Sequence, residues 1–243
     1  MTSTSKFKAG VLTYLDATTD ETILPLNAVF FEDDFIGAAA AAFPTSATAG
    51  TAWGKKLVQS AGTPIVGAVA NYGAGAAKLL LDATSEEQEA TLYFLDNLSI
   101  DTSKIGGFEV QFAMPTIPTG VVQAAFGLQA AYVKGPDNNT VYIRGGLRGN
   151  GSILIESKDG TTTNSVASGT TITTTTETHK LRIDWPAPGT FNVWLDGNQI
   201  SNGTLSFAPS SPILQPYLAL YKASGTGVGQ AAIDYFRCWA NRV

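Results

Sequence analysis

The feature that most restricts the fold of this chain is a two-residue alternation of apolar and polar side chains. In residues 108–114 every second position is apolar, namely Phe108, Val110, Phe112 and Met114. Residues 179–185 repeat the pattern with His179, Leu181, Ile183 and Trp185. Successive side chains of a β-strand point to opposite faces, so each segment has one face to bury and one that can meet solvent. The alternation predicts antiparallel β-sheet.

Turn residues divide the rest of the chain into short strands. A Pro-Ala-Pro-Gly turn follows residue 185, and a tight Asp196-Gly197-Asn198 turn joins residues 191–195 to 199–200, which predicts a meander of hairpins. Gly, Pro, Asn or Asp separate the further strands that we predict, at residues 77–81, 90–94, 121–128, 140–144, 152–156, 216–221 and 233–239. This spacing is typical of β-sandwiches and barrels.

Helix is weakly represented. The alanine-rich residues 38–42 lie between Gly37 and Pro44, so at most a short turn fits there. Residues 85–89 favour a charged loop over one capped helical turn. The threonine-rich residues 161–178 allow a disordered linker, but we favour an exposed hairpin because threonine suits a solvated strand face.

Composition narrows the class of protein. The chain has 243 residues, enough for a large core, and a net charge of −5 with no basic cluster, which argues against nucleic acid or an anionic membrane as partner. Cys238 and His179 are the single residues of their types, which excludes an internal disulfide, a cysteine-based zinc site and a multi-histidine metal centre.

The sequence contains no apolar stretch of the roughly 18 residues that a membrane span requires. The N-terminal residues form no apolar signal region, so we expect folding in a reducing cytoplasm. The Asn-x-Ser/Thr sequences at Asn97, Asn138, Asn150 and Asn202 are then products of the Asn- and Thr-rich composition.

Residues 1–28 differ from the remainder and are interpreted as an N-terminal arm. This segment has few turn residues and too many apolar side chains for a free tail. It either completes the edge of its own domain or packs on a neighbouring subunit. The apolar residues that we expect to make this contact are Phe7, Val11, Leu12, Tyr14, Leu15, Ile23, Leu24 and Leu26.

No catalytic template fits the sequence well, and we predict no enzyme. Nucleophilic hydrolysis needs a Ser or Cys beside a His, but His179 is in phase with a core face and is interpreted as structural. Glycoside hydrolysis needs two carboxylates about 5 to 10 Å apart. The candidates are Glu32, Asp33, Asp34 and Asp234, and adjacent strand residues such as Asp33 and Asp34 point to opposite faces.

Ligand sites are equally sparse, and we predict no metal and no cofactor. The glycines of residues 225–229 lack the Lys-Ser/Thr of a phosphate loop and favour a hairpin loop. Residues 137–139 and 196–198 offer oxygens for calcium but lack EF-hand spacing, so turns are favoured. An aromatic platform for sugars is a further hypothesis, drawn from Trp53, Tyr72, Tyr132, Tyr142 and Trp194, with Trp53, Tyr142 and Trp194 as the selected stacking residues.

Four segments resemble concanavalin A-like lectin/glucanase and laminin-G domains. Residues 178–185 (THKLRIDW) and 191–200 (FNVWLDGNQI) resemble their central hairpin, and residues 232–239 (AIDYFRCW) resemble the final strand of laminarinase-like members. Residues 32–37 (EDDFIG) with Trp53 are similar to the start of the same domains. The resemblance implies an antiparallel jelly-roll β-sandwich over residues 29–243. The catalytic Glu-x-Asp-x-x-Glu strand is absent from the sequence, so it does not imply hydrolase activity.

The arm extends the resemblance to structural proteins of tailed bacteriophages. Residues 6–14 (KFKAGVLTY), together with residues 214–217 and 222–229, resemble virion proteins in which an arm precedes such a domain. The resemblance implies a non-enzymatic virion component, with a capsid decoration protein favoured and a carbohydrate-binding adhesion module as the alternative, ahead of a glycoside hydrolase. The implied partners are the major capsid protein or other virion proteins, with surface glycans for the adhesion alternative. A homo-oligomer, favoured as a trimer, would match the local three-fold positions of an icosahedral shell.

Overall fold

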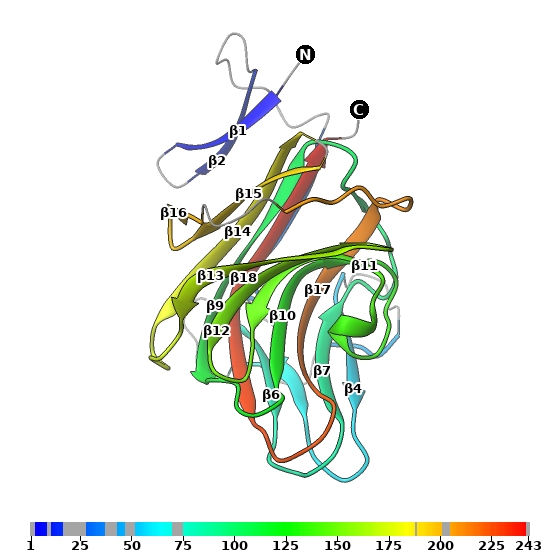
Figure 1. Ribbon diagram of the computed structural model, residues 1–243, viewed down its shortest axis with the longest axis vertical. Helices are drawn as coiled ribbons and strands as arrows, with labels where there is room; N and C mark the ends of the chain where they lie inside the picture. The colour runs from blue at the N-terminus through cyan, green and yellow to red at the C-terminus, as the bar shows by residue number, and fades with distance from the viewer. Residues whose placement is uncertain are drawn as a thin grey trace.

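The chain forms a β-sandwich of two antiparallel sheets (Figure 1). The computed structural model describes residues 3–8, 11–16, 28–36, 43–46, 52–69, 75–187, 189–200 and 205–241. Within these residues the one helical segment is the short 3₁₀ turn η2 (Pro136–Asn138). None of their helices is long and apolar enough to cross a membrane.

Each sheet has eight strands and is named here after its central strand. The β17 sheet has the order β13 (Thr163–Thr171), β12 (Ser152–Asp159), β11 (Val141–Leu147), β10 (Gln123–Gln129), β17 (Ile213–Lys222), β7 (Gln88–Tyr93) and β4 (Gly54–Val58), and β8 (Ile100–Asp101) also pairs with β17. The β18 sheet has the order β16 (Asn198–Gln199), β15 (Thr190–Leu195), β14 (Thr178–Ala187), β9 (Gly106–Thr116), β18 (Gly229–Asn241), β6 (Ala77–Leu81) and β5 (Ile65–Ala68), and β3 (Ala28–Asp33) also pairs with β18.

The alternating segments supply the core, as predicted. Strands β9 and β14 are neighbours, with Val110 opposite Leu181 and Phe108 opposite Ile183. The apolar positions of both strands are at most 1% exposed, whereas His179 is 8% exposed. These side chains fill the space between the two sheets, so the predicted all-β sandwich is confirmed.

The predicted meander is also confirmed, because β14, β15 and β16 pair in sequence order. The turn between β15 and β16 needs positive φ at two successive residues, and Asp196 (51°) and Gly197 (81°) provide them. Asp and Gly tolerate this backbone conformation, which matches the twist of the flanking strands. Asp196 also accepts a hydrogen bond from the backbone N–H of Lys180 and lies 2.8 Å from Nδ1 of His179, which is therefore a structural residue as expected.

The threonine-rich segment forms an exposed strand at the edge of the β17 sheet. β13 pairs with β12, and the turn between them is secured by Asp159, whose carboxylate accepts hydrogen bonds from the N–H groups of Thr161 and Thr162. The pairing register shifts around Gly169, which has a φ of 74°. The threonine-rich segment therefore supplies one strand of an exposed hairpin, and the partner strand β12 precedes residues 161–178.

Two predictions need correction, and a third concerns residues that the structure does not describe. Residues 225–229 do not close a hairpin, because β17 and β18 lie in different sheets and this loop crosses between them. The charged loop expected at residues 85–89 ends earlier than predicted, because Gln88 and Glu89 belong to β7 and are fully buried. The alanine-rich residues 38–42 lie outside the described residues.

The crossing loop is held by a buried lysine. Lys222, at the end of β17, is fully buried, and its ammonium donates hydrogen bonds to three backbone carbonyls, those of Asp82 (2.6 Å), Thr84 (2.7 Å) and Gly227 (3.1 Å). A buried ammonium needs such partners to replace water. Lys222 thereby ties the β17–β18 loop to the β6–β7 connection.

The N-terminal arm contains a hairpin of its own. β1 (Ser3–Lys8) pairs antiparallel with β2 (Val11–Asp16), with Phe7 opposite Leu12 and Ser5 opposite Tyr14. These strands form a separate two-stranded sheet that belongs to neither sheet of the sandwich. Figure 1 shows the hairpin beyond one end of the sandwich, the end at which the C-terminus also lies.

Candidate functional site

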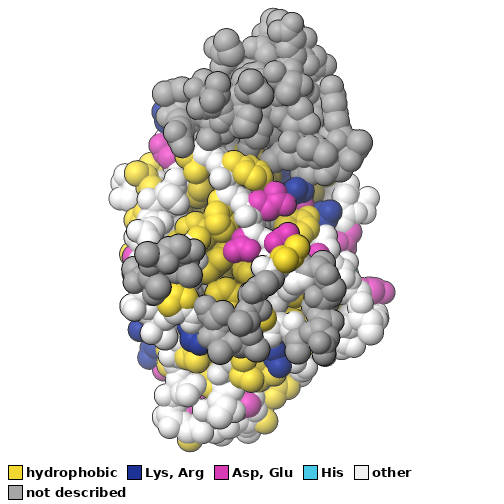
Figure 2. Space-filling model, turned by 180° about the vertical axis from the view of Figure 1, so that it is seen from behind, with side chains coloured by type: hydrophobic (Ala, Val, Ile, Leu, Met, Phe, Trp, Pro, Cys, Tyr) yellow, Lys and Arg dark blue, Asp and Glu magenta, His cyan; other side chains and the backbone are white. Residues whose placement is uncertain are grey.

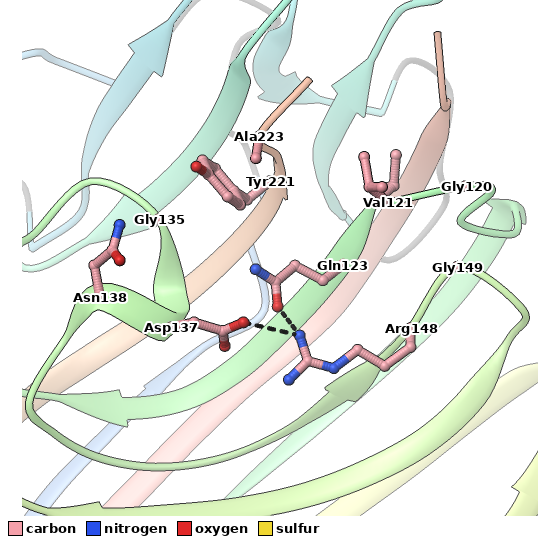
Figure 3. Close-up of a pocket in the computed structure, with 11 residues that line it drawn as sticks. Gly120, Val121, Gln123, Gly135, Asp137, Asn138, Arg148, Gly149, Tyr221 and Ala223 are labelled. Atoms are coloured by element: carbon pink, nitrogen blue, oxygen red, sulfur yellow. Dashed lines mark hydrogen bonds and ion pairs between the residues drawn. The ribbon is translucent and has the colours of Figure 1, made fainter. Parts of the chain in front are cut away.

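A polar pocket opens on the outer face of the β17 sheet, where β10 and β17 meet the 134–138 turn (Figure 3). Its volume is about 400 Å³. Gln123 enters it from β10, Tyr221 from β17, Arg148 from the end of β11, and Asp137 and Asn138 from the turn. An amide, a carboxylate and an aromatic ring therefore face one space.

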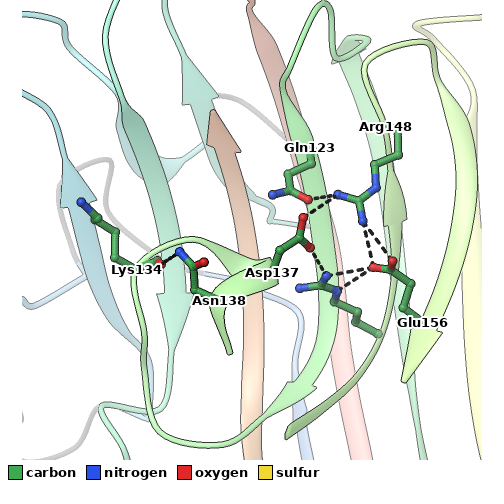
Figure 4. A network of polar contacts seen from close by, with 7 residues as sticks. Gln123, Lys134, Asp137, Asn138, Arg148 and Glu156 are labelled. Carbon is green, nitrogen blue, oxygen red and sulfur yellow. Dashed lines mark hydrogen bonds and ion pairs between the residues drawn. The ribbon is translucent and has the colours of Figure 1, made fainter. Parts of the chain in front are cut away.

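Four charged residues beside the pocket form a closed network (Figure 4). Glu156 accepts hydrogen bonds from Nη2 of Arg144 (2.8 Å) and from Nη2 of Arg148 (3.0 Å). Both guanidinium groups also bind Asp137, at 3.3 Å from Nη1 of Arg148 to Oδ2 and through Nη2 of Arg144 to Oδ1. Two cations and two anions thus neutralise one another.

The four side chains of this network differ in how far they are exposed to solvent. The side chain of Arg144 is 4% exposed and that of Glu156 is 13% exposed, against 35% for Arg148 and 53% for Asp137. Although burial raises the pKa of the Asp137 carboxyl, the charges of Arg144 and Arg148 outweigh it and hold that pKa below its ordinary value. Asp137 is therefore an anion at neutral pH.

The strand register explains why the network forms. Arg144 on β11 lies directly opposite Glu156 on β12, so the two side chains share one face of the sheet. Their neighbours Ile143 and Ile155 point into the core. The Arg144 guanidinium also lies over the Tyr142 ring, 3.9 Å from its centroid.

The 134–138 turn is fixed by its own hydrogen bonds. Gly135 has a φ of 77°, and a side chain there would meet Asn138 and the Tyr221 ring at 3.0 and 3.1 Å. Asn138 donates a hydrogen bond from Nδ2 to the carbonyl of Lys134 (2.8 Å), which orients its Oδ1. The expected turn at residues 137–139 is confirmed, and glycine is required at its start.

A buried carboxylate anchors this turn to the sheet. Glu89 on β7 is fully buried and accepts hydrogen bonds from the N–H of Gly135 (2.9 Å) and the hydroxyl of Thr91 (2.6 Å). The hydroxyl of Tyr217 lies 3.4 Å from the same carboxylate. Burial raises the pKa of Glu89 despite these donors. Residues 130–139 cover this part of the sheet, which is why β7 is buried on both faces.

The outer face of the β18 sheet carries a smaller pocket of about 260 Å³, between Glu109, Lys180, Arg182 and Trp194. Arg237 donates a hydrogen bond to Glu109 (2.5 Å), and the hydroxyl of Tyr235 binds the same oxygen. Figure 2, which views the molecule from behind, shows acidic and basic side chains next to one another among hydrophobic ones.

The three selected aromatic residues lie in three different environments. Trp53 is 2% exposed and packs in the core against Phe31, Phe94 and Phe236. Tyr142 is 3% exposed beneath Arg144. The expectation that these two stack on a sugar is therefore corrected, because neither offers an open ring face. Trp194 is partly exposed, and its Nε1 donates a hydrogen bond to Asp184 (3.0 Å).

The predicted carboxylate candidates gather near one strand pair. Glu32 and Asp33 lie on β3, opposite Arg237 and Phe236 of β18. Asp234 accepts a hydrogen bond from Gln111 (2.6 Å), and burial followed by the charge of Asp34 raises its pKa.

Burial likewise raises the pKa of Asp33, whose carboxylate accepts a hydrogen bond from the N–H of Phe35 (2.7 Å). In the part of the chain that the structure describes, no group of three or more His, Cys, Asp or Glu side chains could hold a metal ion.

The predicted contact residues of the arm are only partly described. Phe7, Val11, Leu12, Tyr14 and Leu15 belong to the β1–β2 hairpin, whereas Ile23, Leu24 and Leu26 lie outside the described residues. Their role in contacts stays a prediction.

The turn at residues 137–139 was predicted from the sequence, but the polar pocket that it helps to build was not. A usable signal was present, because Val141 and Ile143 alternate with Arg144 just as Ile153 and Ile155 alternate with Glu156. A predicted β11–β12 hairpin would have placed the two charges on one outer face. The contribution of the 134–138 turn carries no comparable local signal.

Comparison with known proteins identifies the fold. No family model and no curated protein matches the chain in sequence. Among solved structures, a protein of unknown function from Shewanella oneidensis MR-1 is similar over 88% of this chain and 87% of its own, with a TM-score of 0.60 and 12% identity.

Two further similar structures are a glucanase and a domain with a bound glycan. SCLam, a non-specific endo-β-1,3(4)-glucanase from family GH16, is similar over 90% of this chain and 94% of its own, with a TM-score of 0.57 and 12% identity. The exoplasmic/lumenal domain of VIP36, in its Ca²⁺/Man3GlcNAc-bound form, is similar over 79% of this chain and 84% of its own, with a TM-score of 0.53 and 11% identity. The chain therefore has the concanavalin A-like jelly-roll fold found in glucanases and lectins.

Proposed function

We propose that this chain is a non-enzymatic structural protein of a tailed-bacteriophage virion that binds the outer surface of the head as a capsid decoration protein. The observation that carries the proposal is the N-terminal hairpin, which forms a sheet separate from the sandwich. An isolated two-stranded hairpin is marginally stable in water, so it gains stability from a surface on which to pack. A capsid protein or a sister subunit provides such a surface.

The surroundings of three carboxylates, those of Glu156, Asp137 and Glu109, support a non-enzymatic role. Glycoside hydrolysis uses one carboxyl group as a proton donor and a second as base or nucleophile. On the β17 sheet, Glu156 and Asp137 are bound by two arginines. On the β18 sheet, Glu109 is held by Arg237 and Tyr235. Carboxylates neutralised in this way are poor acids and poor nucleophiles.

The proposed partner is the major capsid protein, contacted mainly through the arm. A stable interface buries about 1,200 Å² or more in total, and an apolar arm added to a small sandwich can reach that area. A homotrimer on the local three-fold positions of the shell is the proposed assembly. The proposed location is therefore the virion.

The test deletes residues 1–27 and leaves β3 intact. The truncated protein is expected to keep the thermal melting curve of the full chain and to lose co-sedimentation with particles that lack the protein. Full-length protein is the control, and hundreds of copies per purified particle are expected. Binding by a folded truncation would instead assign the contact to the sandwich, and a handful of copies would favour a tail component.

A second candidate function is carbohydrate binding, as an adhesion module of the virion. The specific observation in its favour is the polar pocket of the β17 sheet, where the Gln123 amide, the Asp137 carboxylate and the Tyr221 ring face one space. Such groups match the alternating hydroxyl and C–H surfaces of a sugar. Binding on a glycan array without affinity for capsids would place this candidate first.

A further inference from the structure

We propose that the polar pocket of the β17 sheet binds one neutral sugar residue without a metal ion. The inference rests on the carbohydrate-binding candidate above and names its site and its ligand class. Figure 3 shows the Tyr221 ring, the Gln123 amide and the Asn138 amide around a single opening between β10, β17 and the 134–138 turn.

The pocket offers both donors and acceptors at its rim. The carbonyl oxygen of Gln123 accepts a hydrogen bond from Arg148, which directs the two N–H bonds of the amide elsewhere. The amide nitrogen of Gln123 is therefore the atom that can donate to a ligand. Asn138 uses Nδ2 on the carbonyl of Lys134, so its oxygen can accept. A sugar hydroxyl, which both donates and accepts, suits this combination.

An aromatic ring supplies the apolar side. The hydroxyl of Tyr221 donates a hydrogen bond to Glu87 (2.9 Å), and burial together with Glu87 raises the pKa of Tyr221 to about 12. The ring is therefore held in place and neutral at physiological pH. Val121 and Ala223 extend this apolar side. A pyranose presents a face of C–H groups that packs on such a surface while its hydroxyls reach the rim.

The balanced charges around the pocket favour a neutral ligand. Arg144 and Arg148 are balanced by Asp137 and Glu156, and Lys134 is paired with Glu87 at 2.7 Å. A carboxylate-bearing sugar would have to displace one of these ion pairs. It would also approach Asp137, which is 53% exposed and negatively charged. Repulsion by Asp137 therefore disfavours sialic and uronic acids.

The network also removes the need for a metal. Lectin sites that use a cation do so to orient side-chain oxygens around a sugar. Here Arg144 and Arg148 already orient Asp137, and the carbonyl of Lys134 orients Asn138. Binding is therefore expected to persist when divalent cations are removed.

The test uses the full-length protein on an array of neutral, sialylated and uronic acid-containing glycans, followed by titration calorimetry with the neutral oligosaccharide that gives the highest signal. We expect neutral glycans to bind with an affinity unchanged by EDTA. Asn138→Ala removes one hydrogen bond at an exposed position, so the affinity should fall about threefold to tenfold. Val121→Trp fills the pocket from an exposed position and should abolish binding.

Matched controls separate the pocket from the rest of the surface. Val133→Trp makes the same change at another exposed valine outside the pocket lining, and Trp194→Ala removes a partly exposed aromatic side chain of the β18 sheet; both variants should bind like the wild type. Binding that survives Val121→Trp but is lost in Trp194→Ala would overturn the inference and leave carbohydrate binding in place. Selective binding of acidic glycans, or dependence on a divalent cation, would also overturn it. If the wild-type protein bound no glycan, that result would overturn both this inference and the carbohydrate-binding candidate on which it rests.

Discussion

Trp53 and Trp194 have the same side chain in opposite environments, and the difference gives a direct prediction. Trp53 is 2% exposed among aromatic rings, whereas Trp194 is partly exposed with one hydrogen bond to Asp184. Trp53→Ala should reduce the free energy of unfolding by about 3 to 5 kcal/mol because it leaves a large cavity. Trp194→Ala should cost about 1 kcal/mol. Urea denaturation monitored by circular dichroism measures both, and equal losses would contradict the assignment of Trp53 to the core.

A second prediction about a single residue concerns Glu89 and the dependence of stability on pH. Burial raises the pKa of this carboxyl in the folded state above its ordinary value of 4.5. The folded protein therefore holds this proton more tightly than the unfolded chain, so the contribution of Glu89 to stability is fully present below about pH 4.5 and is lost as the pH rises through the raised pKa.

The variant Glu89→Gln should remove this dependence. Melting temperatures of both proteins between pH 4 and pH 8 should show the wild type losing more stability than the variant as the pH rises. Glu177→Gln, at an exposed glutamate, controls for the loss of one negative charge. Parallel curves for the wild type and Glu89→Gln would contradict the raised pKa.

At the scale of elements, the β11–β12 hairpin is the part of the β17 sheet most dependent on charge pairing. Glu156 on β12 accepts hydrogen bonds from both Arg144 and Arg148. Glu156→Gln keeps the shape but leaves the buried Arg144 with only Asp137 as its anionic partner. Removing one partner of a buried ion pair costs about 3 to 5 kcal/mol.

Chemical denaturation should therefore give a loss of that order for Glu156→Gln, and a change near zero for the exposed Glu177→Gln. Hydrogen exchange should also speed up in β11 and β12 while β9 and β14 stay protected. An unchanged denaturation midpoint for Glu156→Gln would contradict the importance of the network.

The same elements mark what the sequence could and could not predict. Strands β9 and β14 were predictable because one face meets the core and the other does not, so their polarity alternates. The burial of β7 could not be predicted, because its outer face is covered by residues 130–139, which are distant in sequence. The alternation of apolar and polar residues along a strand indicates which face meets the core. It does not indicate which distant loop covers the other face. The pocket depends on the same loop, so the sequence could pair Arg144 with Glu156 beside the pocket but could not bring Gln123, Tyr221 and the turn to one opening.

At the scale of the whole molecule, the separation of hairpin and sandwich leads to a prediction about assembly. Because β1 and β2 pair only with each other, the sandwich does not need them to complete either sheet. Sedimentation equilibrium should give a trimer for the full chain and a monomer for residues 28–243, with the same melting temperature. A truncated protein that still forms trimers would place the subunit contact on the sandwich, and one that unfolds would make the hairpin part of the domain.

The position of β18 has a consequence for how this protein folds as it is made. β18 is the last of the described strands in sequence, yet it lies inside its sheet, with β9, β6 and β3 as its partners. Until residues 229–241 have left the ribosome, β9 and β6 have no strand to join them, and the backbone N–H and C=O groups along their facing edges stay unpaired. Folding of this sheet must then wait until β18 has been made, and it must close contacts between residues far apart in sequence, which makes it slow and exposes the nascent chain to aggregation. A cell that makes many copies at once would need chaperones to keep these chains apart.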